Sequence, residues 1–312
     1  MSHDPEDIRA AQEHFGFLAP TPVEKDWYVL RALRVISAID ATPFQLVFAG
    51  GTCLARAHQL VARMSEDVDF KIVHLDPTPL SRSKRRNLLG ELRTRVLAAL
   101  QAEGFHIGPE DMRSRDENQY TLYNLHYAQD AAVASTLRPT IQVELNYAQL
   151  RLPAVLMPVS SFVAEAFERI PEVEAMPCVS VSETAAEKLV SLTRRTAMEL
   201  RGLSRAPDPN LVRHIYDLYA IHTYIDRAVV IELARDIAQA DAEEFSSQYP
   251  AYVNDIAGET HYACVALLSD AAIRERYAQF MSDMVYGTDI DFDEAVNVIA
   301  SLVNEAWPQV KS

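Results

Sequence analysis

The chain has 312 residues, of which 49% are hydrophobic, and a formal net charge of −15 at pH 7. This length and apolar share allow a sizeable core in one large or two ordinary domains, and they argue against a disordered chain. No apolar run reaches the roughly 18 residues that a membrane span needs, and the acidic N-terminus lacks the pattern of a signal peptide, so we expect a cytoplasmic protein with no membrane partner. The three cysteines are far apart and form no CxxC pair, which argues against a zinc site or a disulfide framework.

The first predicted elements are a long helix, a strand, a glycine turn, a shorter helix and a second strand. A capping box that starts at Thr21 begins the long helix. The β-rich run "QLVFAG" (Gln45–Gly50) predicts a strand that ends at two glycines, and residues 52–64 have helical apolar spacing. Residues 67–73, "DVDFKIV", alternate as a strand with its acidic residues on one face.

Both ends of this strand–turn–helix–strand segment suit the binding of a nucleoside triphosphate. Glycines between a strand and a helix allow backbone N–H groups to approach a phosphate, so Gly50, Gly51 and Thr52 are candidate nucleotide-binding residues. Asp67 and Asp69 point the same way on their strand, and two close carboxylates repel each other unless a divalent cation lies between them. Either feature alone is also typical of a tight turn or of a solvated strand face. Together they predict an NTP site with Mg²⁺ bound by the two aspartates.

Residues 81–95 form a basic stripe at the start of a predicted helix. The stripe holds six basic residues and one acidic residue, whereas residues 206–312 hold 6 Lys and Arg against 18 Asp and Glu. A globally acidic protein rarely binds nucleic acid through its overall charge, but a local stripe can hold a phosphate backbone. Lys84, Arg85 and Arg86 are therefore candidate RNA-binding residues. The alternative is an ordinary solvated helix start.

The rest of the chain predicts two more strands and then mostly helices. Residues 119–127 and 139–147 alternate as strands, and Glu144 lies on the polar face of the second. Residues after 158 have mainly helical spacing. We predict a mixed-sheet domain over residues 1–157 and a mainly helical domain over residues 158–312.

The strand–turn–helix–strand segment of residues 45–73 resembles the signature of DNA polymerase β-like nucleotidyltransferases. In that signature a Gly-Gly or Gly-Ser pair and a helix precede a D/E-x-D/E strand. More closely, "GGTCLARAH" followed by "RMSEDVDF" is similar to the AbiEii/AbiGii toxins of bacterial toxin–antitoxin and phage abortive-infection systems. The matching positions are Gly50, Gly51, Thr52, Leu54, Ser65, Glu66, Asp67, Asp69 and Phe70. The resemblance implies an α+β fold: a polymerase β-like core with a mixed β-sheet flanked by helices, followed by a mainly helical domain. It also implies that Ser65 belongs to the nucleotide-binding residues.

Two later blocks of the family correspond to "SETAAEKLVSLTRR" and "RHIYDLYAI". The resemblance implies catalytic roles for Lys188 and Asp217 and a nucleotide-binding role for Lys188. On a helix, Lys188 and Arg195 share a face, and each cation suits a phosphate. The alternatives are a surface lysine whose stem packs on the helix, and an ordinary helix-surface ion pair for Asp217.

The same superfamily usually carries a third carboxylate on the strand beside the D-x-D strand. Glu144 is the candidate for this third metal ligand, and the alternative is an exposed strand glutamate. Because Lys188 and Asp217 fall in the second predicted domain, the active site is expected in the cleft between the domains.

The resemblance implies a toxin that transfers a nucleotide from an NTP to the 3′ end of tRNA, releases pyrophosphate and inhibits translation and growth. A cognate antitoxin would be its protein partner. Two alternatives stay open: an enzyme that nucleotidylates a protein hydroxyl, and a non-catalytic nucleotide- or partner-binding module of the same fold. The intact glycine pair and D-x-D favour an enzyme.

Overall fold

A computed structural model describes residues 4–128, 137–204 and 206–309. The chain divides into two compact units. The first unit comprises Met1–Gln59 and Arg63–Val179, and the second comprises Leu60–Ala62 and Ser180–Ser312. The chain therefore joins the second unit for three residues before it completes the first.

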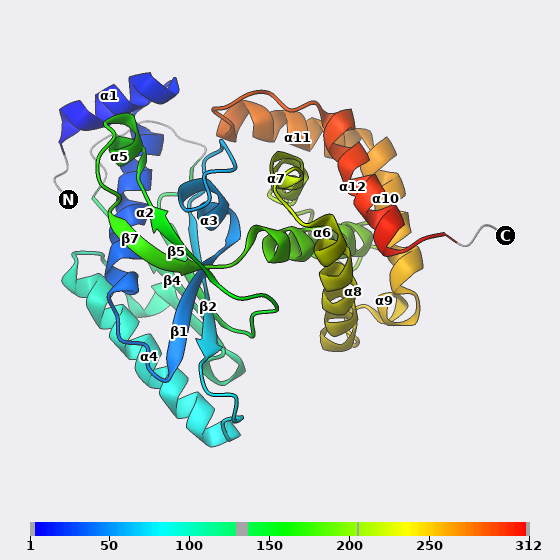
Figure 1. Cartoon of the computed structure of the whole chain (residues 1–312), viewed down its shortest axis with the longest axis horizontal. Helices are drawn as coiled ribbons and strands as arrows, with labels where there is room; N and C mark the ends of the chain where they lie inside the picture. Colours follow the sequence, from blue (N-terminus) through cyan, green and yellow to red (C-terminus); the bar gives the residue numbers. More distant parts are fainter. Residues whose placement is uncertain (1–3, 129–136, 205, 310–312) are drawn as a thin grey trace. The chain divides into compact units, whose positions relative to one another are not determined.

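The first unit is built on one mixed β-sheet of seven strands (Figure 1). The strands are β1 (Phe44–Ala49), β2 (Asp67–His74), β3 (Met112–Arg115), β4 (Tyr120–Leu125), β5 (Ile141–Tyr147), β6 (Val155–Val159) and β7 (Val173–Cys178). They lie in the order β3-β4-β5-β2-β1-β7-β6. The pairs β2–β5 and β1–β7 are parallel, and the other neighbours are antiparallel. The predicted α+β fold with a mixed sheet is confirmed.

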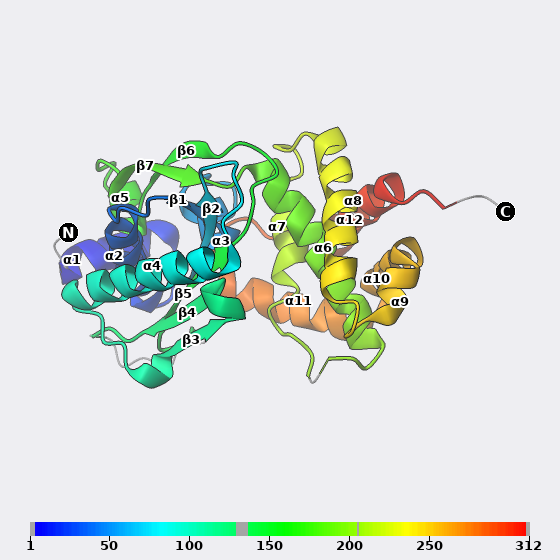
Figure 2. The same ribbon diagram turned by 90° about the horizontal axis from the view of Figure 1, so that it is seen from below.

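Two long helices cover one face of this sheet. The helices of the first unit are α1 (Pro5–Phe15), α2 (Thr21–Ser37), α3 (Gly50–Arg56), α4 (Arg82–Ala102) and α5 (Phe162–Ala166). Helices α2 and α4 contact each other and share a core with the sheet (Figure 1, Figure 2). Val68, Phe70 and Ile72 of β2 point into this core. Because side chains alternate along a strand, Asp67 and Asp69 lie on the opposite face.

The helix after the glycine turn is shorter than predicted. Helix α3 ends at Arg56, whereas the apolar spacing predicted a helix over residues 52–64. Gln59 has a φ of 55°, a left-handed conformation that does not continue an α-helix. The next residues, Leu60–Ala62, pack in the second unit. Val61 is buried, as the apolar spacing predicted, but it lies in an irregular segment and not on a helix.

The start of α2 also differs from the prediction. Its N-cap is Pro20, which has helical dihedral angles of φ −71° and ψ −19°, and no side chain caps the helix. Thr21 is already helical, and its buried hydroxyl has no hydrogen-bond partner among the described residues. Because proline fixes φ near the helical value, the helix begins one residue earlier than the capping pattern indicated.

The first unit extends beyond the boundary predicted at residue 157. Strand β7 pairs with β1 through Phe48 and Cys178, and β6 pairs with β7. Residues 158–179 therefore complete the sheet, and the second unit resumes at Ser180. The pattern missed β7 because "VEAMPC" is short, contains a proline and does not alternate cleanly.

In its described residues the second unit is helical. Its helices are α6 (Val181–Leu200), α7 (Arg213–Ile221), α8 (Arg227–Glu244), α9 (Pro250–Asn254), α10 (Ile256–Ser269), α11 (Ala271–Met284) and α12 (Phe292–Ala306). Along the described parts of the chain, no helix combines the length and the apolar character needed to cross a membrane.

Arg56, the last residue of α3, is buried among acidic side chains of the first unit. Its guanidinium lies 3.6 Å from Oδ1 of Asp26 and 3.5 Å from Oε1 of Glu165. The same group lies 3.8 Å above the ring of Phe162, whose backbone N–H donates to Asp26. Burial raises the pKa of Asp26 to about 7, although Arg56 opposes this rise. Helix α3 is thus fixed to α2 through a carboxyl group that takes up a proton near neutral pH.

Asp26→Asn is expected to remove a pH dependence of stability. The pKa of Asp26 is higher in the folded than in the unfolded chain, so the folded chain binds its proton more tightly. Stability therefore rises as the pH falls through 7, and above pH 7 the charged carboxylate destabilises the folded chain. From pH 8 to pH 6, the free energy of unfolding of the wild type should rise by about 1 kcal/mol relative to Asp26→Asn. Urea unfolding at both pH values measures this difference. Asp40→Asn, at an exposed position, should show no such change. If the stability difference between the wild type and Asp26→Asn is the same at both pH values, the raised pKa of Asp26 is contradicted.

Candidate active site

Three acidic side chains lie on the face of the sheet opposite the helical core. In the parallel pairing of β2 with β5, Asp69 is opposite Glu144, and Asp67 is opposite Gln142. Directly paired residues of neighbouring strands point to the same face. Glu144, predicted as the third acid, therefore lies beside Asp69 on the strand next to the D-x-D strand. The sheet brings all three predicted metal ligands to one face.

The electrostatics of Glu144 show that negative charge is concentrated here. Burial and the charge of Asp67 raise the pKa of Glu144, although a hydrogen bond from Tyr120 and the charge of Arg138 oppose the rise. Burial and Glu144 in turn raise the pKa of Tyr120 to about 12. Glu144 is half-buried, so it is not an ordinary exposed strand glutamate. A surface of this kind favours a bound cation.

The two glycines allow the turn to lie directly against charged groups. Gly50 has a φ of +76°, and a Cβ at this position would lie 2.0 Å from Oδ2 of Asp69. At Gly51 a Cβ would lie 2.3 Å from Nη2 of Arg63 and 3.3 Å from Oγ of Ser65. Arg63 is buried and donates to the carbonyl of Met64 at 2.9 Å. The turn thus lies between a carboxylate that the sequence predicted and a guanidinium that it did not.

The hydroxyl groups of Thr52 and Ser65 join α3 to the start of β2. The Thr52 hydroxyl contacts the carbonyl oxygen of Asp67 and lies 2.8 Å from Oγ of Ser65. A carbonyl only accepts, and a hydroxyl has a single proton, so Thr52 donates to Asp67 and Ser65 donates to Thr52. The side chain of Thr52 is therefore engaged within the protein. The nucleotide-binding roles of the Thr52 N–H and of Ser65 stay predictions.

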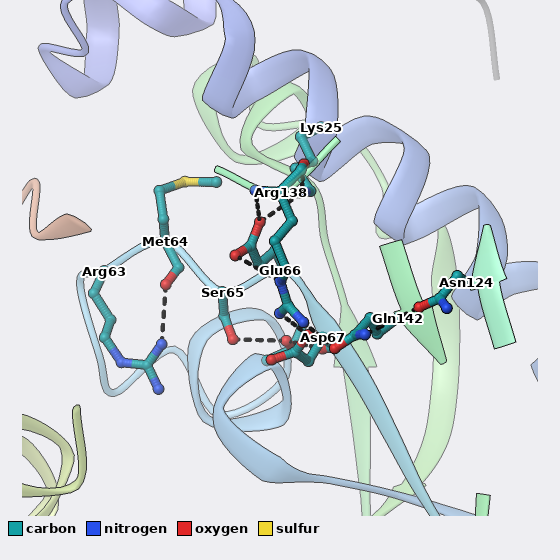
Figure 3. A network of polar contacts seen from close by, with 10 residues as sticks. Lys25, Arg63, Met64, Ser65, Glu66, Asp67, Asn124, Arg138 and Gln142 are labelled. Carbon is teal, nitrogen blue, oxygen red and sulfur yellow. Dashed lines mark hydrogen bonds and ion pairs between the residues drawn. The ribbon is translucent and has the colours of Figure 1, made fainter. Parts of the chain in front are cut away.

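A network of buried charges surrounds Asp67 (Figure 3). Lys25, only 1% exposed, donates to Oε2 of Glu66 and to the backbone carbonyl of Arg138, each at 2.5 Å. Burial alone would raise the pKa of Glu66, but Lys25 and Arg138 outweigh it and lower this pKa. The guanidinium of Arg138 donates to Glu66 at 3.2 Å and forms an ion pair with Asp67.

Sequence reasoning missed most of this network. Glu66 belonged to the motif without a role, and Lys25 and Arg138 lie far from it in the chain. In the sequence, Lys25 and Arg138 shared one feature: each is a basic residue within a predicted helix or strand or next to one. Nothing in their spacing connected them, because the contacts join residues 41 and 72 positions from Glu66.

The acidic face has suitable donors for Mg²⁺. Asp67, Asp69 and Glu144 supply carboxylate oxygens, the ligands that Mg²⁺ prefers. Across the described residues, no three His, Cys, Asp or Glu side chains converge as a metal site. At Asp67, however, the guanidinium of Arg138 already occupies a cation position. The donor chemistry of these residues suits a divalent ion, and the binding of Mg²⁺ stays a prediction.

Lys188 and Asp217 form a buried ion pair in the second unit. Nζ of Lys188 lies 2.8 Å from Oδ2 of Asp217, which is fully buried, and 3.4 Å from Nδ1 of His214. Lys188 is therefore not a solvated surface lysine. An ammonium group has three N–H donors, so Lys188 can hold Asp217 and still donate to a phosphate. The other predicted catalytic residues belong to the first unit, and the predicted cleft stays a prediction.

Arg195, predicted to bind a phosphate, also lies in the second unit and forms an ion pair with Asp208. Its neighbour Arg194 donates to Asp241 at 2.8 Å and lies 4.1 Å above the ring of Phe245. A phosphate at Arg195 would have to share the guanidinium with Asp208, so this position is less available than the sequence indicated.

The basic stripe occupies the first turns of α4, where Ser81 caps the helix. Lys84 and Arg86 are exposed, whereas Arg85 is half-buried with its guanidinium 5.6 Å from the ring of Tyr147. Beside it lies a groove of about 750 Å³, lined by Arg86, Asn87, Gly90, Glu91, Arg93, Thr94, Arg95 and Asn118. The basic residues of the stripe thus lie along one open surface of α4.

A glycine turn packed on a strand with paired aspartates, in a mixed sheet, is the arrangement of a nucleotidyltransferase. Residues 32–298 match the family model described as nucleotidyl transferase AbiEii toxin, type IV toxin–antitoxin system. The chain therefore belongs to the AbiEii nucleotidyltransferase toxin family, and the predicted resemblance is confirmed. No curated protein matches the sequence.

Among solved structures, the chain is similar to MenT4, a nucleotidyltransferase toxin from Mycobacterium tuberculosis H37Rv. The TM-score is 0.50 over 95% of this chain and 98% of MenT4, at 18% sequence identity. The likeness supports the fold.

Gly50→Ala is expected to destabilise the protein more than Gly16→Ala. Both glycines have left-handed backbones, with φ of +76° and +71°, but a Cβ at Gly16 has nothing within 4 Å. Gly16→Ala should therefore cost about 1 kcal/mol, the strain of the backbone alone. Gly50→Ala should cost at least about 2 kcal/mol more, because the new methyl group displaces Asp69. Urea unfolding measures both, and equal losses would mean that the turn has room for a side chain.

Proposed function

We propose that this protein transfers a nucleotide from an NTP to the 3′ end of tRNA in a Mg²⁺-dependent reaction, and so inhibits translation and growth. A cognate antitoxin would restrain it. The observation that carries the proposal is the contact between the glycine turn and the acidic face: Gly50 lies against Asp69, with Glu144 beside it on the next strand. Family membership supplies the class of reaction.

Each part of the site has a role in this proposal. Asp67, Asp69 and Glu144 would hold Mg²⁺, which supplies charge to neutralise the triphosphate and to lower the pKa of the acceptor hydroxyl. Backbone N–H groups at Gly51 and Thr52 would bind the phosphates, because no side chain at the glycines keeps them away. In the reaction the acceptor hydroxyl loses its proton to solvent and its oxygen bonds to the α-phosphorus. The bond from this phosphorus to the oxygen that bridges it to the β-phosphorus breaks, and pyrophosphate leaves.

Charged side chains would stabilise the departing pyrophosphate. Lys188 is the candidate from the second unit, and its ion pair with buried Asp217 holds its ammonium in a fixed position. Arg63 is a further candidate, since its guanidinium lies against Gly51 in the first unit. Arginine can bind two phosphate oxygens at once, which suits a polyphosphate.

The acceptor is proposed from the family and from the basic stripe on α4. Lys84 and Arg86 are exposed, and Arg93 and Arg95 of the same stripe line the groove beside them. An RNA backbone carries regularly spaced phosphates, which such a row of cations can hold independently of base sequence.

One experiment separates this function from its alternatives. The protein is incubated with total tRNA, Mg²⁺ and each of the four α-labelled NTPs in turn, and the products are separated as RNA and protein. Label in RNA supports the proposal. Label in protein identifies a protein-nucleotidylating enzyme, and no label with any NTP indicates a non-catalytic binding module.

Asp67→Asn and Asp69→Asn should each reduce nucleotide transfer by at least ~10²-fold, because the loss of one preorganised charge at a reacting centre typically has this effect. The fold should survive, since removing one of several like charges on the acidic face relieves repulsion. Initial rates of label transfer measure the loss, and circular dichroism checks the fold. Asp76→Asn, an exposed aspartate just after β2, is the control and should retain near wild-type transfer. Transfer by either site variant at the rate of this control contradicts the assignment.

The triple variant Lys84→Ala, Arg85→Ala, Arg86→Ala should weaken tRNA binding and flatten its salt dependence. Each lost phosphate contact lowers the slope of log affinity against log salt by roughly one unit. Binding of free NTP should be unchanged. A matched triple variant of three exposed arginines in the same unit, Arg113, Arg115 and Arg151 to Ala, removes the same charge elsewhere. Filter binding at several salt concentrations decides the question, and equal slopes for both triple variants would leave the stripe without a role in RNA binding.

A further inference from the structure

Arg138 is held at five atoms, and these contacts fall into two groups. Its backbone N–H donates to Glu66 at 2.9 Å, and its backbone carbonyl accepts from Lys25 at 2.5 Å. Its side chain donates through Nε to Glu66, through Nη1 to Gln142 and through Nη2 to Asp67. The backbone contacts involve two residues that are at most 3% exposed, whereas the side chains of Arg138 and Asp67 are 33% and 30% exposed.

The position of the backbone therefore does not depend on where the guanidinium lies. Lys25 and Glu66 would continue to hold the main chain of Arg138 if its side chain left Asp67. Of the guanidinium's other two acceptors, Glu66 keeps its bonds to Lys25 and to the backbone of Arg138, and Gln142 still donates to Asn124 at 3.0 Å. The backbone of Arg138 is thus held separately, and its guanidinium reaches Asp67 (Figure 3).

The charge of this guanidinium matters because the face beneath it is acidic. Asp67, Asp69 and Glu144 lie on neighbouring strands, and the charge of Asp67 already acts on Glu144. A guanidinium bound to Asp67 compensates part of that charge. Two effects oppose a divalent cation at Asp67 while Arg138 is bound there. The positive charge of Arg138 repels the cation, and Arg138 already occupies a carboxylate oxygen that would otherwise be a metal ligand.

We propose that Arg138 is an internal competitor for the cation at Asp67: it neutralises the acidic face when no divalent ion is bound and must leave Asp67 when one binds. Its freed N–H donors then face the same site and can bind a phosphate oxygen of the nucleotide. Metal and nucleotide would thus each favour the binding of the other through one side chain. This inference rests on the proposed function, because it takes Asp67 to be a metal ligand.

The test measures Mn²⁺ binding to the full chain without nucleotide, by electron paramagnetic resonance of the free ion. Arg138→Gln should bind Mn²⁺ at least ~5-fold more tightly than the wild type, because a positive charge a few ångströms from the ion is removed. Arg113→Gln makes the same change at an exposed position of β3 and should leave the affinity unaltered. A role for Arg138 in structure alone predicts unchanged or weaker binding of Mn²⁺, and that result overturns the inference.

Two further variants keep the outcome interpretable. Arg138→Lys retains the charge and should stay within about twofold of the wild type in Mn²⁺ affinity. If Arg138→Lys tightens Mn²⁺ binding as much as Arg138→Gln does, charge is not the cause.

Asp67→Asn tests the metal site of the proposed function. If Asp67→Asn abolishes Mn²⁺ binding while Arg138→Gln leaves it unchanged, the competition fails and the metal site stands. If Asp67→Asn has no effect, the metal site of the proposed function fails, and the inference fails with it.

Discussion

The lack of space between Gly50 and Asp69 is the constraint on which the site in the first unit depends. Strand β1 ends at Ala49, directly opposite Asp69, and the chain must turn there into α3 without a side chain. Thr52 then donates to the carbonyl of Asp67, so the first turn of the helix contacts both aspartates of the D-x-D. The backbone that would receive phosphates and the carboxylates that would receive a cation are thus parts of one rigid contact. A shift of β2 moves both together.

Helix α2 supports this contact through two adjacent residues of opposite charge. Lys25 reaches Glu66 just before β2, and Asp26 reaches Arg56 at the end of α3. The irregular segment between these points is therefore held at both ends by the same helical turn. Buried ion pairs of this kind contribute little net stability, but removing one partner costs about 3–5 kcal/mol, so they strongly favour one geometry over its alternatives.

The sequence predicted those parts of the fold that local periodicity controls. Alternation placed Asp67 and Asp69 on one face, and the family resemblance placed Glu144 on a neighbouring strand; the structure has both features. Periodicity failed at α3, because Val61 is buried by a distant part of the chain rather than on a helix. It also could not find Arg138, whose partners are set by strand order and not by spacing. Both failures involve contacts between residues far apart in sequence, which the spacing of residues along the chain does not display.

The segment Leu60–Ala62 has a consequence for how the two units are delimited. The backbone N–H of Ala62 donates to the hydroxyl of Tyr216, and its carbonyl accepts from the backbone N–H groups of Tyr286 and Gly287. The polypeptide therefore crosses between the units three times, and no single cut separates them into two complete pieces. A fragment that begins at Ser180 would lack the partners of Tyr216 and Tyr286, and a fragment that ends at Val179 would expose residues that normally lie inside the other unit. Gene fusions, truncations and domain exchanges within this fold must keep both stretches in one chain.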